Sequence, residues 1–157
     1  MKALILSDSH RDFSSILRAM EQEKNITHII HAGDVQKDVD DIMALWQELP
    51  CISVLGNNDF NVWGEPTQRE FILEGKQILL THGHLYRVKS SLAPLQKEAR
   101  SIQADICIFG HTHQPFLEQR DGIWFLNPGP AHRSYATMEI IHNNIDIQLK
   151  ENEKRVR

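Results

Sequence analysis

Residues 3–10 read ALILSDSH, an apolar run that ends on an acid, a hydroxyl and an imidazole. A short apolar run that stops at such a cluster is typical of a buried strand whose carboxyl end carries a functional loop. The arrangement recurs four more times, at Gly33-Asp34, Gly56-Asn57-Asn58-Asp59, His82-Gly83-His84 and Gly110-His111-Thr112-His113. If the apolar runs before these endings are strands that share a sheet, their carboxyl ends converge, and ligand sites of open α/β sheets lie at that edge.

Around these runs, the hydrophobic pattern predicts helices first and hairpins later. Apolar residues recur at helical spacing in segments 13–23, 38–49 and 90–103. Alternating segments around short polar turns predict hairpins that pair 71–73 with 77–80, 115–119 with 123–126, and 136–141 with 145–149. Two β-α-β steps followed by hairpins predict an α/β fold of two sheets packed face to face, with helices outside. Residues 151–157 are expected to form a frayed, charged tail.

The length and composition bound the class of protein. With 157 residues, the chain suits a single domain, residues 1–157, with one core. The net charge of −4 gives no field for holding extended nucleic acid, so small substrates are expected. No targeting segment or bilayer-spanning run is visible, which predicts a soluble, cytoplasmic protein without a membrane partner. Cys51 and Cys107 lack CxxC spacing and are expected to be buried free thiols.

The five polar endings offer seven candidate metal ligands, which are Asp8, His10, Asp34, Asn57, His82, His111 and His113. Side chains at i and i+2 of an extended segment point to the same side, so Asp8 and His10 can approach a common site, as can His111 and His113. The first three motifs alone also suit an ordinary strand end or turn, whereas clustered histidines after apolar runs are rarely needed for folding. Complementary ligand types at five strand ends together favour a metal site. Seven ligands exceed the needs of a closed zinc site and suit two ions roughly 3.5 to 4 Å apart, bridged by one carboxylate.

The chemistry of these ligands restricts the metal. Carboxylate, imidazole and amide oxygen without thiolate favour manganese, iron, zinc, nickel or magnesium. Gly33, Gly56 and Gly110 stand directly before ligands, where the lack of a Cβ allows sharp turns and close approach. The remaining histidines outside the motifs are expected to be surface or satisfied core residues, and they are His28, His31, His132 and His142.

The ordered set Asp-x-His, Gly-Asp, Gly-Asn-x-Asp, His-Gly-His and Gly-His-x-His resembles the calcineurin-like metallophosphoesterases, particularly their small single-domain prokaryotic phosphodiesterase branch. The resemblance runs from Ala3 to about Pro130 and includes the turn Asn127-Pro128-Gly129. It implies a four-layer α/β/β/α sandwich of two mixed sheets flanked by helices, with a dinuclear centre that often holds manganese. It also implies that Asp8, His10 and His113 hold one ion, that Asn57, His82 and His111 hold the other, and that Asp34 bridges them.

Two departures from the family pattern concern substrate binding and catalysis. Larger members place a histidine after the Gly-Asn pair to protonate the leaving group, but this chain has Asn58, whose amide donates a hydrogen bond and not a proton. Asn58 is therefore the candidate catalytic and substrate-binding donor. Arg11 stands where the small branch usually has glycine, and it either binds a substrate phosphate or points into solvent. Asp59 and His84 are expected to orient the metal ligands.

These residues predict a mechanism. Two divalent ions would lower the pKa of a shared water from 15.7 toward roughly 7, so that a bridging hydroxide attacks phosphorus in line at neutral pH. Without a strong acid at Asn58, esters with stable leaving groups should react best. The prediction is therefore hydrolysis of small phosphodiesters ahead of phosphomonoesters.

Other functions stay open. A retromer subunit resembles this fold but works chiefly as a protein-binding scaffold, so a non-catalytic metal-binding scaffold is the main alternative. The complete ligand set favours an enzyme, whereas Asn58 is the one feature that favours the scaffold. A phosphomonoesterase and a nuclease for cyclic or short nucleotides are further alternatives. Family analogy alone suggests a homodimer.

Overall fold

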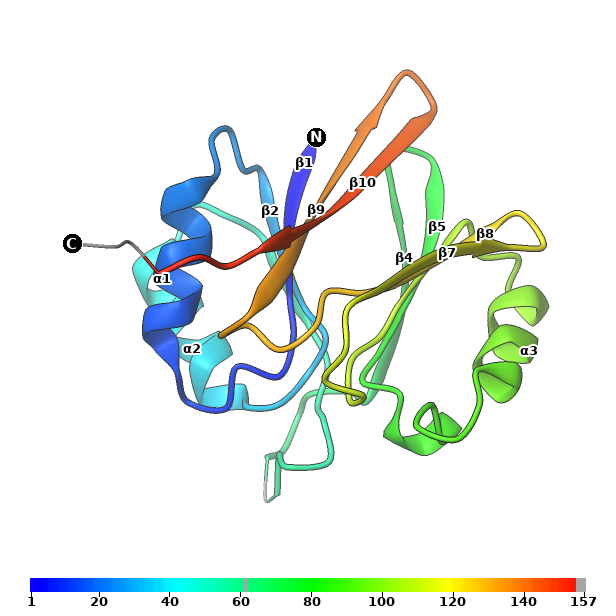
Figure 1. The fold of residues 1–157 in the computed structure, drawn as a ribbon, viewed down its shortest axis with the longest axis horizontal. Helices are drawn as coiled ribbons and strands as arrows, with labels where there is room; N and C mark the ends of the chain where they lie inside the picture. The colour runs from blue at the N-terminus through cyan, green and yellow to red at the C-terminus, as the bar shows by residue number, and fades with distance from the viewer. Residues whose placement is uncertain (61, 155–157) are drawn as a thin grey trace.

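The computed structural model of the chain describes residues 1–60 and 62–154, and Figure 1 shows two sheets that face each other with helices on the outside. The first sheet contains β1 (Lys2–Leu6), β2 (His28–His31), β3 (Cys51–Ser53), β9 (Ser134–Ile141) and β10 (Asn144–Glu151), in the order β10-β9-β1-β2-β3. The second contains β4 (Gln68–Leu73), β5 (Lys76–Thr81), β6 (Ile106–Ile108), β7 (Phe116–Arg120) and β8 (Ile123–Asn127), in the order β4-β5-β6-β8-β7. The expected α/β/β/α sandwich of two mixed sheets is confirmed.

The strand directions bring the polar endings together. Strands β1, β2 and β3 pair in parallel, as do β5 and β6, and each of these five strands precedes one of the five motifs. The connections in the first sheet are the helices α1 (Phe13–Gln22) and α2 (Gln36–Leu45), which lie on its outer face in Figure 1. Helix α3 (Ala93–Ser101) covers the second sheet, after a 3-10 turn at His84–Tyr86. No helix of the described residues is long and apolar enough to cross a membrane.

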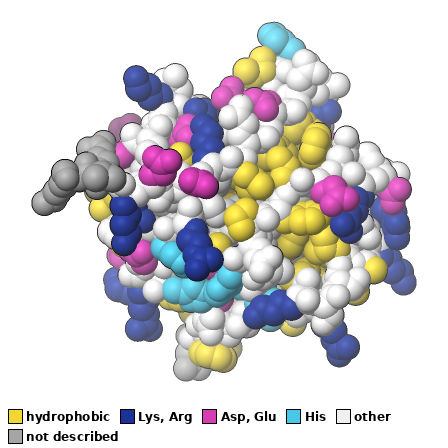
Figure 2. All heavy atoms as spheres, viewed as in Figure 1, with side chains coloured by type: hydrophobic (Ala, Val, Ile, Leu, Met, Phe, Trp, Pro, Cys, Tyr) yellow, Lys and Arg dark blue, Asp and Glu magenta, His cyan; other side chains and the backbone are white. Residues whose placement is uncertain are grey.

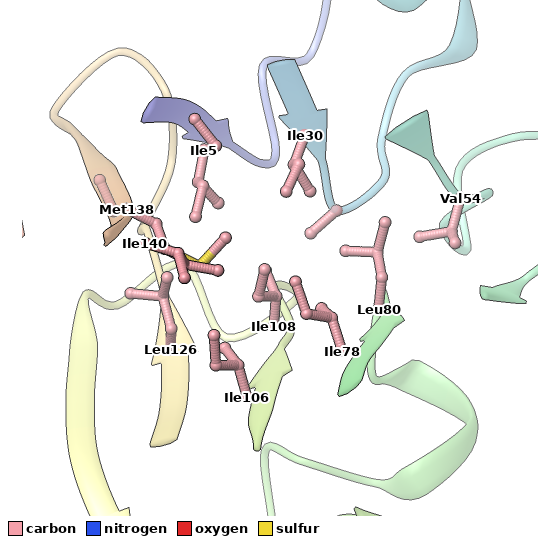
Figure 3. Packing of buried hydrophobic residues seen from close by; sticks show 13 residues of the cluster. Ile5, Ile30, Val54, Ile78, Leu80, Ile106, Ile108, Leu126, Met138 and Ile140 are labelled. Atoms are coloured by element: carbon pink, nitrogen blue, oxygen red, sulfur yellow. The ribbon is translucent and has the colours of Figure 1, made fainter. Parts of the chain in front are cut away.

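The main hydrophobic core lies between the two sheets. Figure 3 shows Ile5 and Ile30 from the first sheet pointing toward Ile78 and Ile108 from the second, and all four are fully buried. Burial of aliphatic side chains of this size contributes roughly 1.5 to 3 kcal/mol each. Because this core joins both sheets directly below the strand ends, it fixes the positions of the loops that carry the motifs.

Several element boundaries differ from the predictions, whereas the three predicted hairpins are confirmed. The second helix ends at Leu45 because Trp46 leaves helical geometry, and its ring lies 6.2 Å from that of Phe13. The third helix begins only at Ala93, with proline at its start. Asp12 caps the first helix by accepting a hydrogen bond from the Ser15 amide.

The prediction of a frayed tail is wrong for the first part of segment 151–157. Glu151 pairs with Ser134 as the last residue of β10. The side chain of Asn152 is buried and donates hydrogen bonds to the carbonyl oxygens of Ser15 and Ala131. A single polar residue thus ties the end of the chain to α1, and residues 155–157 lie outside the described part. Cys51 and Cys107 are free thiols, as expected, with Cys107 fully buried and Cys51 partly buried.

A carboxylate at the end of α1 joins the helix to the first sheet. The side chain of Glu23 is 4% exposed and accepts hydrogen bonds from Lys2 Nζ at 2.9 Å, Lys150 Nζ at 2.7 Å and Tyr135 Oη at 2.8 Å. Burial raises the pKa of Glu23, but the hydrogen bonds from Lys150, Lys2 and Tyr135 outweigh it, so the pKa lies below the usual 4.5. The ionised form is therefore favoured by folding.

Replacing this carboxylate should destabilise the fold. We expect Glu23→Gln to lower the free energy of unfolding by about 2 kcal/mol at pH 7, because two ammonium groups lose a charged acceptor. A depressed pKa stabilises the fold above the unfolded value, so the difference should shrink as the pH falls below 4.5. Urea denaturation at pH 7 and at a pH below 4.5 measures the difference in unfolding free energy. Glu48→Gln, at an exposed position, is the control. Equal stability of wild type and Glu23→Gln at pH 7 would contradict the assignment.

Candidate metal centre

The five motifs meet at one end of the sandwich. Hydrogen bonds link loops that are far apart in the sequence, since His82 Nδ1 lies 2.8 Å from the Ala32 carbonyl oxygen and the His111 amide donates to Asp8 at 3.1 Å. Figure 2 shows histidine side chains gathered on one face of the molecule, beside lysine and arginine side chains. The strand ends therefore form one site, as the sequence predicted.

The carboxylate of Asp8 lies at the centre of this site. Its Oδ1 lies 3.3 Å from His113 Nε2, 3.7 Å from His10 Nε2 and 3.7 Å from His82 Nε2. Its Oδ2 accepts hydrogen bonds from the Ser7 hydroxyl and the His111 amide, at 2.6 and 3.1 Å. Oδ1 is buried and has no hydrogen-bond partner among the described residues.

One ring nitrogen of His82 faces the carboxylates without a hydrogen-bond partner among the described residues. Its Nδ1 must donate to the Ala32 carbonyl, which can only accept, so in the neutral ring Nε2 carries a lone pair. That Nε2 is buried without a hydrogen-bond partner among the described residues, 3.5 Å from Asp34 Oδ2 and 3.7 Å from Asp8 Oδ1. Buried lone pairs and carboxylate oxygens that face one another need a cation between them, so these residues fit a metal ion.

The candidate ligands form two groups that share Asp8. Asp8, His10 and His113 make one group, and Asp8, Asp34 and His82 make the other, with the ligand atoms of each group within 4.8 Å of one another. Beside the second group, His111 Nδ1 lies 3.0 Å from Asn57 Oδ1, and the His111 ring is centred 5.2 Å from that of His82. The structure thus brings all seven candidate ligands together. It makes Asp8 common to both groups, whereas the family resemblance gives the bridging role to Asp34.

Burial keeps the His111 ring in its uncharged form. Burial, followed by repulsion from His82, lowers the pKa of His111 to about 4. At neutral pH the ring is therefore uncharged, which is the form that binds metal.

The backbone of the ligand loops is strained. Asp8, Asp34, His111 and His113 have left-handed φ angles of 51°, 51°, 70° and 58°. This region costs non-glycine residues free energy and is found at functional sites where the surroundings enforce it. Close packing also explains the glycine at position 56, because a Cβ there would collide with the carboxylate of Asp34. The sequence predicted a glycine here for close approach to a metal ion, and the structure shows close approach to the candidate ligand Asp34.

A buried chain of hydrogen bonds connects the first two motifs. The Gly33 amide donates to His31 Nδ1 at 3.2 Å, so His31 Nε2 carries the proton toward Ser9 Oγ at 2.9 Å. The Ser9 hydroxyl donates to Asp38 Oδ2 at 2.6 Å, which also accepts the Arg11 amide at 2.9 Å. Because Ser9 lies between two ligands and Gly33 precedes a third, this chain fixes both loops. His31 is thus a satisfied core histidine, one of the two expected possibilities, but its support of the ligand loops was not predicted, and its place two residues before Gly33 was the available signal.

Asp59 and Asn58 hold the loop of Asp34. The Asp59 carboxylate accepts hydrogen bonds from the amides of Gly56, Gln36 and Asp34, at 2.7, 2.7 and 3.3 Å. The Asn58 side-chain amide donates to Asp34 Oδ2 at 2.7 Å, and its backbone amide donates to Oδ1 at 3.0 Å. Asn58 therefore contacts the candidate ligand Asp34 directly and remains exposed at the rim of the site.

Three other residues complete the surroundings of the site. The buried amide of Asn127 donates to the Gly110 carbonyl and to Thr112 Oγ1, which steadies the loop of His111 and His113. The ring of His84 is centred 5.5 Å from that of His82, and its Nδ1 is buried without a hydrogen-bond partner among the described residues. Arg11 is exposed and lines a cavity of about 660 Å3 together with Asn58.

Comparison with known proteins identifies the class. A family profile described as a calcineurin-like phosphoesterase superfamily domain matches residues 1–146. A protein of Mycoplasma pneumoniae named probable metallophosphoesterase is 37% identical over 134 residues, which cover 82% of this chain and 77% of that protein. A phosphodiesterase of Methanocaldococcus jannaschii is 29% identical over 149 residues, with coverage of 82% and 83%.

Solved structures share the fold. A conserved uncharacterized protein of Streptococcus pneumoniae, described as a predicted phosphoesterase, matches with a TM-score of 0.80 and 27% identity, covering 99% of this chain and 92% of that one. Vps29 of Entamoeba histolytica, in complex with zinc, matches with a TM-score of 0.73 and 21% identity, covering 98% and 100%, a likeness that concerns the fold alone.

The sandwich, the carboxylates and imidazoles at its strand ends and these relatives define the class as metallophosphoesterase. Within that class, the chain belongs to the calcineurin-like phosphoesterase superfamily.

The hydrogen-bonded chain through Ser9 should support metal binding. We expect Ser9→Ala to weaken Mn²⁺ binding by about 10- to 100-fold, because the loops of Asp8 and Asp34 lose their common support. Calorimetric titration of the metal-free protein measures the affinity. Ser101→Ala, which removes an exposed hydroxyl on α3, is the matched control. Unchanged affinity in a folded Ser9→Ala protein would show that the chain does not position the ligands.

Proposed function

We propose that this protein is a dinuclear metal-dependent phosphodiesterase that hydrolyses small phosphodiesters. The observation that carries the proposal is the pair of buried atoms Asp8 Oδ1 and His82 Nε2, which face each other without hydrogen-bond partners among the described residues. Such an arrangement is unfavourable unless a cation binds there. Membership of a superfamily whose named relatives are metallophosphoesterases and phosphodiesterases supports the same reading.

The proposed ligands divide between two divalent ions. Asp8, His10 and His113 would hold one ion, and Asn57, His82 and His111 would hold the other. The shared carboxylate would be Asp34 by the family pattern or Asp8 by the distances in this chain. Manganese is the expected metal, and zinc, iron, nickel and magnesium are compatible with the same ligands. When bound, the two ions supply Lewis acidity and a water of lowered pKa.

The protein's own residues then bind and orient the phosphate. Asn58 lies against Asp34 at the exposed rim, where its amide group is within reach of a phosphate oxygen on a bound ester, and Arg11 lines the adjacent cavity as a second donor. Neither side chain can give a proton to the leaving group at neutral pH. The reaction therefore favours esters whose leaving group departs unprotonated. This condition favours diesters with acidic alcohols or phenols over ordinary phosphomonoesters.

A scaffold role is the alternative from a different class. The likeness to Vps29 shows that a protein not named as a phosphoesterase has the same fold, but a likeness of fold does not assign a function to this chain. The complete set of seven candidate ligands supports catalysis, because a scaffold has no need to keep buried, unpaired ligand atoms. Metal content combined with turnover separates the two proposals.

Removing one ligand should abolish activity. We expect purified wild type to hold two metal ions per chain and Asp34→Ala to hold fewer, with diester hydrolysis reduced by at least about 100-fold. Elemental analysis and a bis(4-nitrophenyl) phosphate assay with added Mn²⁺ measure the two quantities. Asp121→Asn, an exposed carboxylate away from the site, is the control. Full metal content and an unchanged rate in Asp34→Ala would refute the metal mechanism.

The identity of residue 58 should set the preference between ester types. Wild type is expected to hydrolyse bis(4-nitrophenyl) phosphate faster than 4-nitrophenyl phosphate. Asn58→His should raise hydrolysis of an alkyl monoester such as glycerol 2-phosphate by about 100-fold, because it adds a group able to protonate a poor leaving oxygen, and it should change the 4-nitrophenyl esters little. Steady-state kcat/KM for the three esters gives the comparison. Wild-type activity on monoesters alone would contradict the proposed preference for diesters over monoesters.

A further inference from the structure

A second cavity lies beside the loop that carries His111 and His113. It has a volume of about 440 Å3 and lies between the segment before α3, residues 88–92, and the segment after β6, residues 112–116. Thr112, which lines it, stands between the candidate ligands His111 and His113. Lys89 is also in its wall. The cavity therefore adjoins the place of the phosphate.

The wall of this cavity suits an anion with an apolar body. Phe116, Leu92 and Val88 give apolar surface, and none of its lining residues is a carboxylate, although the chain carries a net charge of −4. Arg120 lies over the Phe116 ring at 5.5 Å and is paired with Glu118 at 3.0 Å. Lys89 has no hydrogen bond or ion pair with any described residue, so it is the cation left to meet a ligand.

The two cavities divide the ester groups of a diester between them. The cavity with Arg11 is lined by α2 and by loops that follow strands of the first sheet, and its Arg11 and Asn58 are exposed, so water there can reach a departing oxygen. It shares no lining residue with the cavity of Lys89, which is built by loops of the second sheet. The leaving group therefore belongs on the Asn58 side, and the retained ester group belongs on the Lys89 side.

We infer that the cavity of Lys89 and Phe116 binds the retained organic group of the phosphodiester, that this group is a flat ring system of aryl or nucleoside size, and that Lys89 contacts the phosphate. The volume lies within the range of small-ligand sites, roughly 300 to 1,000 Å3. Apolar side chains favour a ring over a short alkyl group, since each buried methylene alone changes discrimination by about tenfold or more. This inference rests on the proposed phosphodiesterase function.

Two probes with one leaving group test the inference. 4-Nitrophenyl phenyl phosphate and 4-nitrophenyl methyl phosphate both release 4-nitrophenolate and differ only in the retained group. Each kcat/KM of the Mn²⁺-loaded protein is divided by the rate constant of the hydroxide reaction, which removes intrinsic reactivity. We expect the phenyl ester to be preferred by about tenfold or more. Calorimetry should show the same preference for phenylphosphonate over methylphosphonate, without any turnover.

Variants of the cavity wall separate its two roles. Ser90→Trp, at an exposed lining residue, should fill the cavity and bring the phenyl-to-methyl ratio to about one. Lys89→Gln should lower both esters by about tenfold and leave the ratio unchanged, and Lys89→Arg should restore both. Lys97→Trp and Lys97→Gln, at an exposed position of α3 outside the cavity, are the matched controls.

The outcomes distinguish this inference from the function on which it rests. A preference for the phenyl ester that Ser90→Trp removes and Lys97→Trp keeps supports the cavity as the binding site. Turnover of both esters at equal corrected rates, or a ratio that Ser90→Trp leaves intact, overturns the inference and leaves the phosphodiesterase standing. Turnover of neither ester by the metal-loaded wild type overturns the proposed function itself.

Discussion

The buried carboxylate of Asp8 is the constraint on which the rest of the site depends. Its Oδ1 faces three imidazole nitrogens at 3.3 to 3.7 Å and has no hydrogen-bond partner among the described residues. A buried anion beside bare lone pairs is unfavourable in the protein alone, so the folded chain must hold these groups together until a cation binds. The left-handed residues of the loops, the closely packed glycine at position 56 and the hydrogen bonds around the site together hold these groups in place.

Rigidity for this purpose comes from the sandwich. The core between the sheets lies just below the strand ends, and Ile5, Ile30 and Ile108 within it are fully buried. Each ligand loop is also tied to a neighbouring loop, through Ser9 and His31 on one side and through Asp59 and Asn127 on the other. Left-handed backbone at Asp8 and Asp34 persists because packing and hydrogen bonds determine those positions from several directions.

The sequence was sufficient for the features that repeat locally. Apolar runs ending on candidate ligand residues predicted the five strands and the meeting of their polar ends, because strand periodicity and ligand chemistry are both visible in short segments. The five strands do not share one sheet as expected, since β1, β2 and β3 lie in the first sheet and β5 and β6 lie in the second. The role of His31 was not visible, since it depends on hydrogen bonds to Gly33 and to Ser9, 22 residues away. The anchoring of Asn152 depends on residues up to 137 positions away. Trp46 ends α2 early beside Phe13, which no local pattern indicates. The central place of Asp8 likewise arises only when the loops are assembled in three dimensions.

The position of Asn58 links the geometry of the site to its chemistry. Its amide nitrogen lies 2.7 Å from Asp34 Oδ2, so the residue that would otherwise face the leaving group is engaged in holding a candidate ligand. A side chain in that role needs a permanent donor, and an amide provides one at any pH, whereas a histidine does so only in one protonation state or tautomer. Under the proposed function, asparagine therefore secures Asp34 at the expense of acid catalysis. In the proposed mechanism, the adjoining cavity, which is open to solvent on the Asn58 side and contains Arg11, leaves water as the source of the proton, and the rate then depends on how well the departing oxygen bears its negative charge.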